Sequence, residues 1–243
     1  MFLEDTPMNK SPAKSLKKIK AKASRNRKRV LVIDDHPMMR AGLVQLINNQ
    51  PDMIVCAEAG QPTEVFAVIS QARPDMVLTD LTMPGRGGLD FIKDLLALRP
   101  ELPILVMSLH DELIFAERCL RAGARGYIMK EAGSVNLLAA LRRVIDGQTH
   151  VSPSVSESIM GNLSARKPRG SSSPIHALSD REFEVFERVG QGKSTREIAE
   201  EMHLSPKTID VHRANIRAKL GLKDVTALVR YAVRWLESQN SAA

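Results

Sequence analysis

The sequence has few cysteines and lacks any long apolar run. Cys56 and Cys119 are the only cysteines among 243 residues, and both lie inside apolar-patterned segments. This is typical of reduced core thiols rather than of a disulfide framework or a cysteine metal site. No stretch approaches the roughly 18 apolar residues of a membrane span, and no apolar segment resembling a secretory signal follows the N-terminal charges. We therefore expect a cytoplasmic protein with no membrane association.

The positive charge is concentrated in an N-terminal tail. Residues 1–29 carry ten Lys or Arg and two acids, a net charge of +8, whereas residues 30–147 carry eleven and fifteen, a net charge of −4. Residues 148–176 and 177–243 add only +2 and +1. The tail has too few large apolar groups to offset its ordering entropy, so we expect it to be disordered. Such a tail is either a nucleic-acid contact or a solubilising extension.

Length and loop residues predict two domains. A chain of 243 residues exceeds the usual size of one domain, and Gly, Pro and Ser cluster between about 148 and 176. That segment lacks apolar periodicity and contains SPSVSES and KPRGSSSP, so we interpret residues 148–176 as a short helical piece followed by a flexible linker. The predicted domains are residues 30–147 and 177–243.

Residues 30–147 alternate between strand and helix signals. The first strand-like run begins at Val30, and further runs cover residues 53–57, 76–79, 104–107 and 126–129. A helical pattern follows the first run and ends at Asn49, and further helical patterns cover residues 62–72, 89–98, 111–122 and 134–146. Neighbouring parallel strands need crossover helices, so five of each predict a doubly wound five-stranded parallel sheet, an α/β fold.

Polar residues stand at the ends of four of these strands. Asp34 and Asp35 follow the first strand, Asp80 ends the third, Ser108 follows the fourth and Lys130 the fifth. The carboxyl edge of an open α/β sheet is where ligands bind. Three converging carboxylates would repel one another and raise one another's pKa. A bound Mg²⁺ relieves this repulsion, because it is a cation that takes oxygen ligands. One oxygen of Asp80 then remains free as a nucleophile for a phosphoryl group, whose other oxygens Ser108 and Lys130 can hold.

Helix start signals dominate the chain from Leu178 onward. Ser179 with Glu182 and Ser194 with Glu197 form two capping boxes, and Ser205 stands before a proline at the first helical position. These signals predict helices near 180–189, 195–202, 206–220 and 224–236. The short connection between the second and third helices is what a helix-turn-helix requires, so we expect an all-α four-helix domain.

The helix predicted at 206–220 has two different faces. Ile209, Ile216 and Leu220 share an apolar face, with His212 packed at its margin in a structural role. Small and hydrogen-bonding side chains elsewhere let the helix approach base edges, while flanking cations meet phosphates. We therefore expect double-stranded DNA as a partner. The predicted DNA-binding residues are Lys207, Thr208, Asp210, Val211, Ala214, Asn215, Arg217 and Lys219.

Both segments resemble known families. Residues 30–147 resemble the receiver domain of bacterial two-component response regulators, and LSDREFEVFERVGQGKSTREIAEEMHLSPKTIDVHRANIRAKLGL resembles the LuxR-type DNA-binding domain. Their combination is similar to the NarL/FixJ class of regulators. The resemblance implies a sensor histidine kinase as upstream partner, a homodimer on DNA formed through the last helix, and RNA polymerase as a further partner.

The resemblance also assigns roles to residues of the first domain. It implies Asp34 and Asp35 as the acidic pair, Asp80 as phosphoacceptor, and the Thr82 carbonyl as a metal ligand beside them. It further implies Ser108 and Lys130 as phosphoryl-binding residues and Tyr127 as the aromatic switch. Each residue taken alone has an ordinary explanation, since Asp34 could cap a helix, Lys130 could be a solvated charge and Tyr127 could be core. Their convergence at one sheet edge favours the functional interpretation.

These observations together predict a phosphorylation-controlled transcription factor that is not an enzyme, apart from its own phosphotransfer and dephosphorylation. A first alternative is an aspartyl-phosphate phosphatase or mutase, which needs a carboxylate two residues after the nucleophile, where this chain has Thr82. A second is a constitutive DNA-binding protein whose first domain only dimerises. The complete set of polar residues at the strand ends argues against that alternative.

Overall fold

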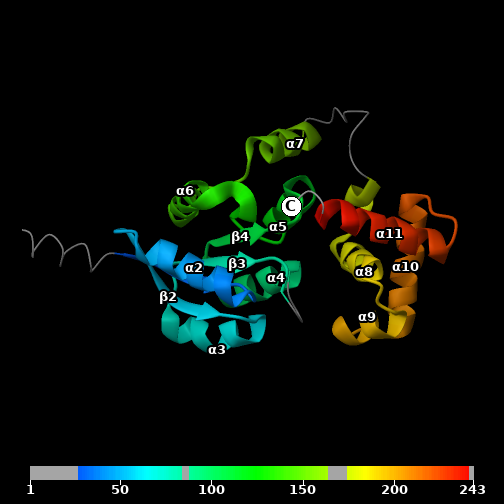
Figure 1. The fold of residues 1–243 in the computed structure, drawn as a ribbon, viewed down its shortest axis with the longest axis horizontal. Coiled ribbons are helices and arrows are strands. Elements are labelled where there is room, and N and C mark those ends of the chain that lie inside the picture. Colours follow the sequence, from blue (N-terminus) through cyan, green and yellow to red (C-terminus); the bar gives the residue numbers. More distant parts are fainter. Residues whose placement is uncertain (1–26, 84–87, 164–173, 241–243) are drawn as a thin grey trace, which may run out of the picture.

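The computed structural model describes residues 27–83, 88–163 and 174–240, which form two folded parts joined at one contact region (Figure 1). The first part is a five-stranded parallel sheet in the order β2-β1-β3-β4-β5, with helices on both faces. Its elements are β1 (Lys28–Ile33), α2 (Pro37–Asn48), β2 (Met53–Ala59), α3 (Pro62–Ala72), β3 (Met76–Asp80), α4 (Gly88–Leu98), β4 (Ile104–Ser108), α5 (Glu112–Arg121), β5 (Gly126–Met129) and α6 (Gly133–Ile145). The predicted doubly wound α/β fold is confirmed.

Alternation along β1 explains why helices cover both faces of the sheet. Val30 and Val32 pack in the cluster that contains residues of α2 and α6, whereas Leu31 and Ile33 pack in the cluster with α3, α4 and α5. Successive side chains of a strand point to opposite faces, so a strand that is apolar at every position is buried on both. Strands β3 and β4 are buried at every residue, which places their carboxyl ends in the middle of the sheet edge.

The first domain begins earlier than the sequence pattern predicts. Strand β1 starts at Lys28 rather than at Val30. Arg27 is also part of the fold, because its guanidinium donates to the carbonyls of Met53, Asn48 and Gln50. The disordered tail predicted over residues 1–29 therefore extends too far, because residues 27–29 belong to the folded domain. Residues 1–26 lie outside the described residues.

The short helical piece predicted within residues 148–176 is present, and it packs against the first domain. His150 forms a bridge with Gly126 and its carbonyl accepts from Tyr127 N at 2.9 Å. A Cβ on Gly126 would lie 2.9 Å from the His150 oxygen, so this close approach requires glycine. Helix α7 (Pro153–Leu163) then packs on α5, with Val155 2% exposed. The apolar residues 151, 155 and 159 have helical spacing, but this short pattern does not identify the helix that they pack against.

The second part is a four-helix domain that begins with the short turn η2 (Pro174–Ala177), where Ile175 is fully buried. Its helices are α8 (Asp180–Gly190), α9 (Thr195–Glu201), α10 (Pro206–Leu220) and α11 (Val225–Asn240). Both predicted capping boxes are present, and the Ser205 hydroxyl accepts from Thr208 N as expected. Residues 164–173 of the predicted linker lie outside the described residues. Across the part of the chain that the structure describes, every helix is too short or too polar to cross a membrane.

Candidate functional site

The predicted polar residues meet at the carboxyl edge of the sheet, because β1 and β3 are neighbours and end side by side. Asp34 directly follows β1 and Asp80 is the last residue of β3, and their exposed fractions are 0% and 3%. Lys130 follows β5 and reaches back across the edge, with Nζ 3.0 Å from Asp34 Oδ2 and 2.8 Å from Asp80 Oδ2. One ammonium group thus holds two buried carboxylates in place.

Burial and hydrogen bonding oppose each other at this edge. Burial raises the pKa of Asp80, and the hydrogen bonds from Lys130 and from Thr82 N only partly offset this effect. Burial alone would lower the pKa of Lys130, but its hydrogen bonds to Asp80 and Asp34 outweigh burial and raise it. Asp80 is therefore short of positive charge, which a further cation at the same edge would supply.

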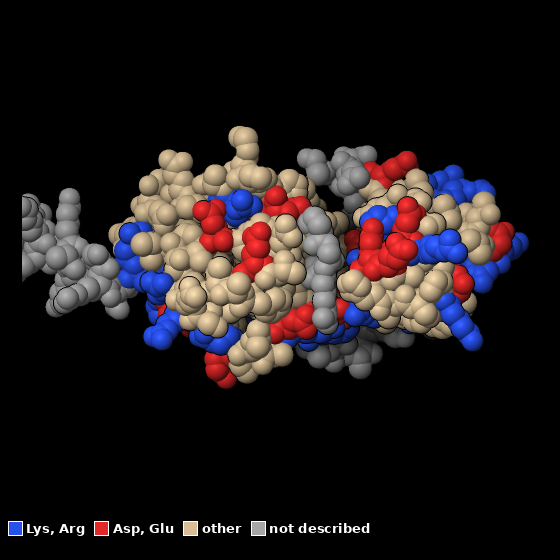
Figure 2. All heavy atoms as spheres, turned by 90° about the horizontal axis from the view of Figure 1, so that it is seen from below, with Lys and Arg blue, Asp and Glu red and all other residues tan. Residues whose placement is uncertain are grey.

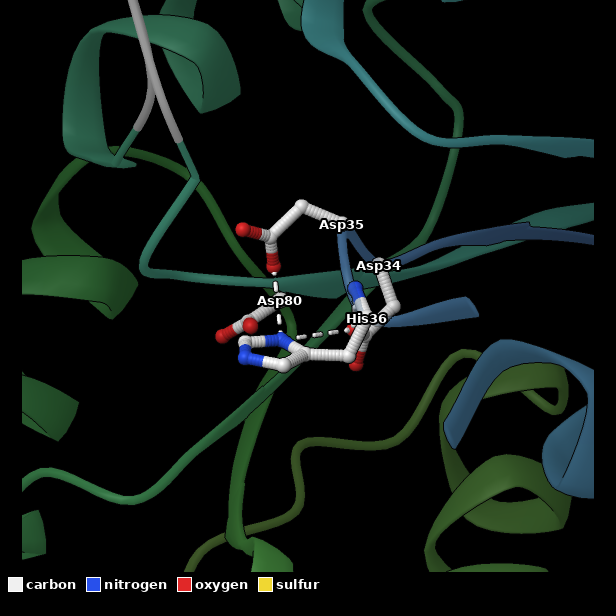
Figure 3. Close-up of side chains that lie close together, drawn as sticks. All are labelled: Asp34, Asp35, His36 and Asp80. Atoms are coloured by element: carbon white, nitrogen blue, oxygen red, sulfur yellow. Dashed lines mark hydrogen bonds and ion pairs between the residues drawn. The ribbon is translucent and has the colours of Figure 1, made fainter. Parts of the chain in front are cut away.

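Four side chains form a group with the donor set of a divalent cation site (Figure 3). Candidate ligand atoms of Asp34, Asp35, His36 and Asp80 lie within 4.8 Å of one another. Asp35 Oδ1 is buried and accepts no hydrogen bond, although the His36 ring nitrogen Nδ1 lies 2.8 Å away. Carboxylate oxygens with spare lone pairs fit Mg²⁺. His36 was not predicted from the sequence, and its position directly after the acidic pair was the available signal.

The loop after β4 ties Ser108 and Tyr127 to the acidic edge. The Ser108 hydroxyl accepts from His110 N at 3.1 Å, and the Tyr127 hydroxyl donates to the His110 carbonyl at 2.7 Å. The His110 ring in turn bonds the Thr82 hydroxyl at 2.7 Å, and Thr82 N donates to Asp80. Tyr127 is 1% exposed, and burial raises its pKa well above the usual value. The predicted switch residue therefore points inward, and His110, which was not predicted, connects it to the edge.

The same loop leads to the contact between the two domains. The His110 ring stacks on Phe115 of α5 with centroids 4.6 Å apart, and Phe115 meets Phe183 of α8 edge to face. Arg118, one turn further along α5, lies 5.0 Å above the Phe183 ring and donates to Asp180 at 3.1 Å. This cation–π contact is unusual because the arginine is only 7% exposed. We call these residues, His110, Phe115, Arg118, Asp180 and Phe183, the interdomain contact.

Backbone carbonyls complete the surroundings of Arg118. Its Nη2 donates to the carbonyls of Ile175 and Leu178, at 3.2 and 2.8 Å. Ion pairs of Arg181 with Asp90 and of Lys93 with Asp180 lie at the rim. The sequence did not indicate this role for Arg118, because its partners are 57 to 62 residues away.

A cavity of about 500 Å³ lies between the domains, beside the interdomain contact. The loops that carry Asp35 and Thr82 line one side, and helices α8 and α9 line the other. Glu187 of α8 faces this cavity, and burial raises its pKa to about 8, against the opposing effect of Arg188. In Figure 2, acidic side chains gather toward the middle of the molecule and basic side chains toward its two ends.

The predicted DNA-binding residues of helix α10 differ in their exposure to solvent. The exposed positions are Lys207, Asp210, Val211, Ala214 and Asn215, while Thr208 and Arg217 are half-buried. Lys219 does not extend freely, because its Nζ lies 2.6 Å from Glu182 Oε2. On the opposite face Ile209 and Ile216 are fully buried, with Leu220 and His212 partly buried beside them. The main contacts of α10 are with α8, α9, α11 and η2, which leaves the predicted face open.

Comparison with known proteins agrees with both domains. The response regulator receiver domain matches residues 30–142, and the luxR family of bacterial regulatory proteins matches residues 176–232. The oxygen regulatory protein NreC of Staphylococcus aureus (strain bovine RF122 / ET3-1) is 35% identical over 210 residues, which cover 85% of this chain and 97% of that protein.

Solved structures of the response regulator RcsB are similar over both domains. RcsB of Salmonella typhimurium has a TM-score of 0.68 and 26% identity, covering 86% of this chain and 98% of that one. RcsB from Salmonella enterica serovar Typhimurium, bound to promoter P1flhDC in the presence of the phosphomimetic BeF3-, has a TM-score of 0.67 and 25% identity, covering 85% and 98%. This chain belongs to the NarL/FixJ class of two-component response regulators, which join a receiver domain to a LuxR-type DNA-binding domain and regulate transcription.

Proposed function

We propose that Asp80 is the residue that receives the phosphoryl group, from a sensor histidine kinase, and that this event controls binding to promoter DNA. The observation that carries the proposal is the pairing of Lys130 Nζ with both Asp80 and Asp34 at the carboxyl edge of the sheet. A carboxylate oxygen of Asp80 attacks phosphorus, a P–O bond forms, and the bond to the kinase imidazole breaks with its electron pair left on nitrogen. Lys130 and the Ser108 hydroxyl then bind oxygens of the transferred group.

A divalent cation fits the same edge. Asp34, Asp35 and Asp80 with the Thr82 carbonyl would hold Mg²⁺, which when bound supplies positive charge to the phosphoryl oxygens. The buried Asp35 oxygen without a hydrogen bond supports this assignment. Thr82 stands where an aspartyl-phosphate phosphatase needs a carboxylate, so we propose that the receiver catalyses only its own phosphotransfer and dephosphorylation.

The signal would reach the DNA-binding domain through His110. The Ser108 hydroxyl that would donate to a phosphoryl oxygen also accepts from His110 N, so its rotation toward the phosphoryl group would shift the His110 backbone. Because the His110 ring stacks on Phe115, its displacement changes the interdomain contact. We propose that the released protein binds double-stranded DNA in the cytoplasm as a homodimer and acts there on transcription by RNA polymerase.

Intact mass after incubation with acetyl phosphate and Mg²⁺ tests the assignment. We expect one phosphate on the parent chain and none on Asp80→Asn. Asp75→Asn is the matched control, since Asp75 lies at the opposite end of the same strand and accepts from Arg29 N. Equal labelling of Asp80→Asn and the parent would show that another residue is the acceptor.

A further inference from the structure

His36 brings an imidazole into an otherwise carboxylate site. Across the described ranges, one group of His, Cys, Asp and Glu side chains is close enough to hold a metal, and His36 is its only nitrogen donor. The ring nitrogen Nδ1 lies 2.8 Å from Asp35 Oδ1 and 3.3 Å from Asp34 Oδ1. Figure 3 shows the ring turned toward both carboxylates and close to Asp80.

These distances match the spacing of neighbouring ligands around one cation. Ligands at roughly 2.1 Å in an octahedral shell lie about 3 Å from their neighbours. The separations of His36 Nδ1 from the two carboxylate oxygens bracket that value. Asp35 Oδ1 is buried and accepts no hydrogen bond, so it has a lone pair available for a cation.

The Oδ1 atoms of Asp34 and Asp80 each accept one backbone hydrogen bond, from His36 N and Thr82 N, and each keeps a second lone pair for a cation. Lys130 takes Oδ2 of Asp34 and Oδ2 of Asp80, so the Oδ1 atoms of both residues are turned away from the ammonium group. The His36 ring is not used to cap α2, because the helix begins at Pro37 without a side-chain capping bond. The ring Nδ1 instead faces the Oδ1 atoms of Asp34 and Asp35.

We propose that His36 is a nitrogen ligand of the cation at this site, and that the site consequently binds divalent first-row transition metals such as Mn²⁺ and Co²⁺ more tightly than Mg²⁺. Mg²⁺ prefers oxygen ligands, whereas imidazole favours first-row transition metals. The inference rests on the proposed phosphorylation site, because it concerns the cation held beside Asp80. It adds a residue and a metal preference to that site.

Metal titration of the full chain tests the inference. We would measure Mn²⁺ binding by the loss of the free-ion EPR signal, and Mg²⁺ binding by calorimetry, for the parent, His36→Ala and His36→Asn. We expect both variants to weaken Mn²⁺ binding about tenfold or more, the size typical of a lost metal-site interaction, with less than about a twofold change for Mg²⁺. Pulsed EPR of bound Mn²⁺ should show coupling to an imidazole nitrogen in the parent and none in either variant.

Two further variants separate the inference from the proposed site. His203→Asn replaces an exposed histidine of the DNA-binding domain, in a left-handed conformation that Asn tolerates, and should bind both ions as the parent does. Asp35→Asn should weaken both ions. If it does and His36→Ala changes Mn²⁺ and Mg²⁺ binding alike or not at all, the role of His36 is wrong. If Asp35→Asn binds both ions normally, the proposed cation site itself is wrong.

Discussion

Phe115 of the receiver domain meets Phe183 of the DNA-binding domain edge to face, with ring centroids 4.9 Å apart at an interplanar angle of 85°. Such aromatic pairs contribute about 0.5–1.5 kcal/mol beyond their buried area. The other face of Phe115 receives the His110 ring, which is bonded to Thr82 beside Asp80. The side chains of His110, Phe115 and Phe183 therefore form a continuous series of contacts from the loop beside Asp80 to the second domain.

Substituting Arg118 should separate the domains without unfolding either of them. Arg118→Ala removes one charged hydrogen bond to Asp180, two to backbone carbonyls and the contact with the Phe183 ring. Hydrogen bonds to charged groups contribute about 1.5–3 kcal/mol, so we expect the fraction of separated domains to rise about 10- to 100-fold. Small-angle scattering of the unphosphorylated protein should show an increased radius of gyration.

Arg121→Ala is the control for this substitution. Arg121 lies on the same helix, but its side chain is 74% exposed and pairs only locally with Glu117. An exposed pair of this kind contributes less than about 1 kcal/mol. Equal scattering curves for the parent, Arg118→Ala and Arg121→Ala would contradict a holding role for Arg118.

Raising the pH should weaken the docked arrangement through Glu187. Burial raises the pKa of this residue from its ordinary value of 4.5 to about 8, and Glu184 beside it is shifted in the same direction. Separation of the domains opens the cavity to water and returns the pKa of Glu187 toward 4.5. Between about pH 4.5 and pH 8, Glu187 therefore holds more protons in the docked form than in the separated form. Docking is therefore most favourable below about pH 4.5 and loses stability as the pH rises toward 8.

Glu187→Gln provides the test of this pH dependence, because glutamine keeps the shape and carries no titrating proton. The parent should expand between about pH 5 and about pH 8 in scattering measurements, while the variant should change much less. The opposing charges of Arg188 and Arg118 are the same in both proteins. A pH response of equal size in the variant would assign the effect to other groups.

Lys130→Met should destabilise the receiver domain and make its stability more dependent on Mg²⁺. The substitution leaves Asp34 and Asp80 buried without their shared cation, and breaking a buried ion pair costs roughly 3–5 kcal/mol. Urea unfolding with and without Mg²⁺ measures both effects, since a ligand that binds the folded state stabilises it. Lys93→Met, at a side chain 48% exposed, should change stability by less than about 1 kcal/mol.

Helix α10 should read base sequence through its exposed positions. Lys207→Ala and Asn215→Ala should each cost about 1–3 kcal/mol at one base pair and relax the preference there. Arg217→Ala should instead weaken binding to all sequences and reduce its salt dependence. Binding to a selected site and its single-base variants measures this difference, and uniform losses for all three substitutions would exclude α10 as the reader.

Removing residues 1–26 should reduce the salt dependence of DNA binding without changing the preferred site. Basic residues that contact phosphates release counterions and read no bases. The truncation keeps Arg27, because its side chain bonds three backbone carbonyls of the receiver domain. Binding-site selection with both proteins checks the prediction, and a new consensus sequence after truncation would contradict it.

The fold and the acidic edge could be predicted because their signals are local. Runs that are apolar at every position identify β3 and β4 as central strands, and the residue after such a run must lie at the sheet edge. Asp34, Asp80 and Lys130 could therefore be placed together without knowing their distances. Capping boxes are equally local, and both predicted ones are present.

Side chains whose partners are distant in the sequence could not be predicted. Arg118 has the pattern of a helical surface residue, and only the docked domain makes it buried. Lys219 was expected at a DNA phosphate, but in the free chain Glu182 is its partner across 37 residues. A short helical piece was predicted within residues 148–176, but its packing on α5 was not, because that packing depends on contacts with residues about 40 positions away.

Helix α7 shortens the tether between the domains and so limits how far they can part. Because α7 is fixed on the receiver, only ten residues separate Leu163 from Pro174, the start of η2. A chain of this length spans at most about 40 Å when fully extended. A released DNA-binding domain therefore stays at a high local concentration near α5, in the millimolar range typical of short tethers. Loss of the phosphoryl group should be followed by rapid return to the docked form, at a rate independent of protein concentration.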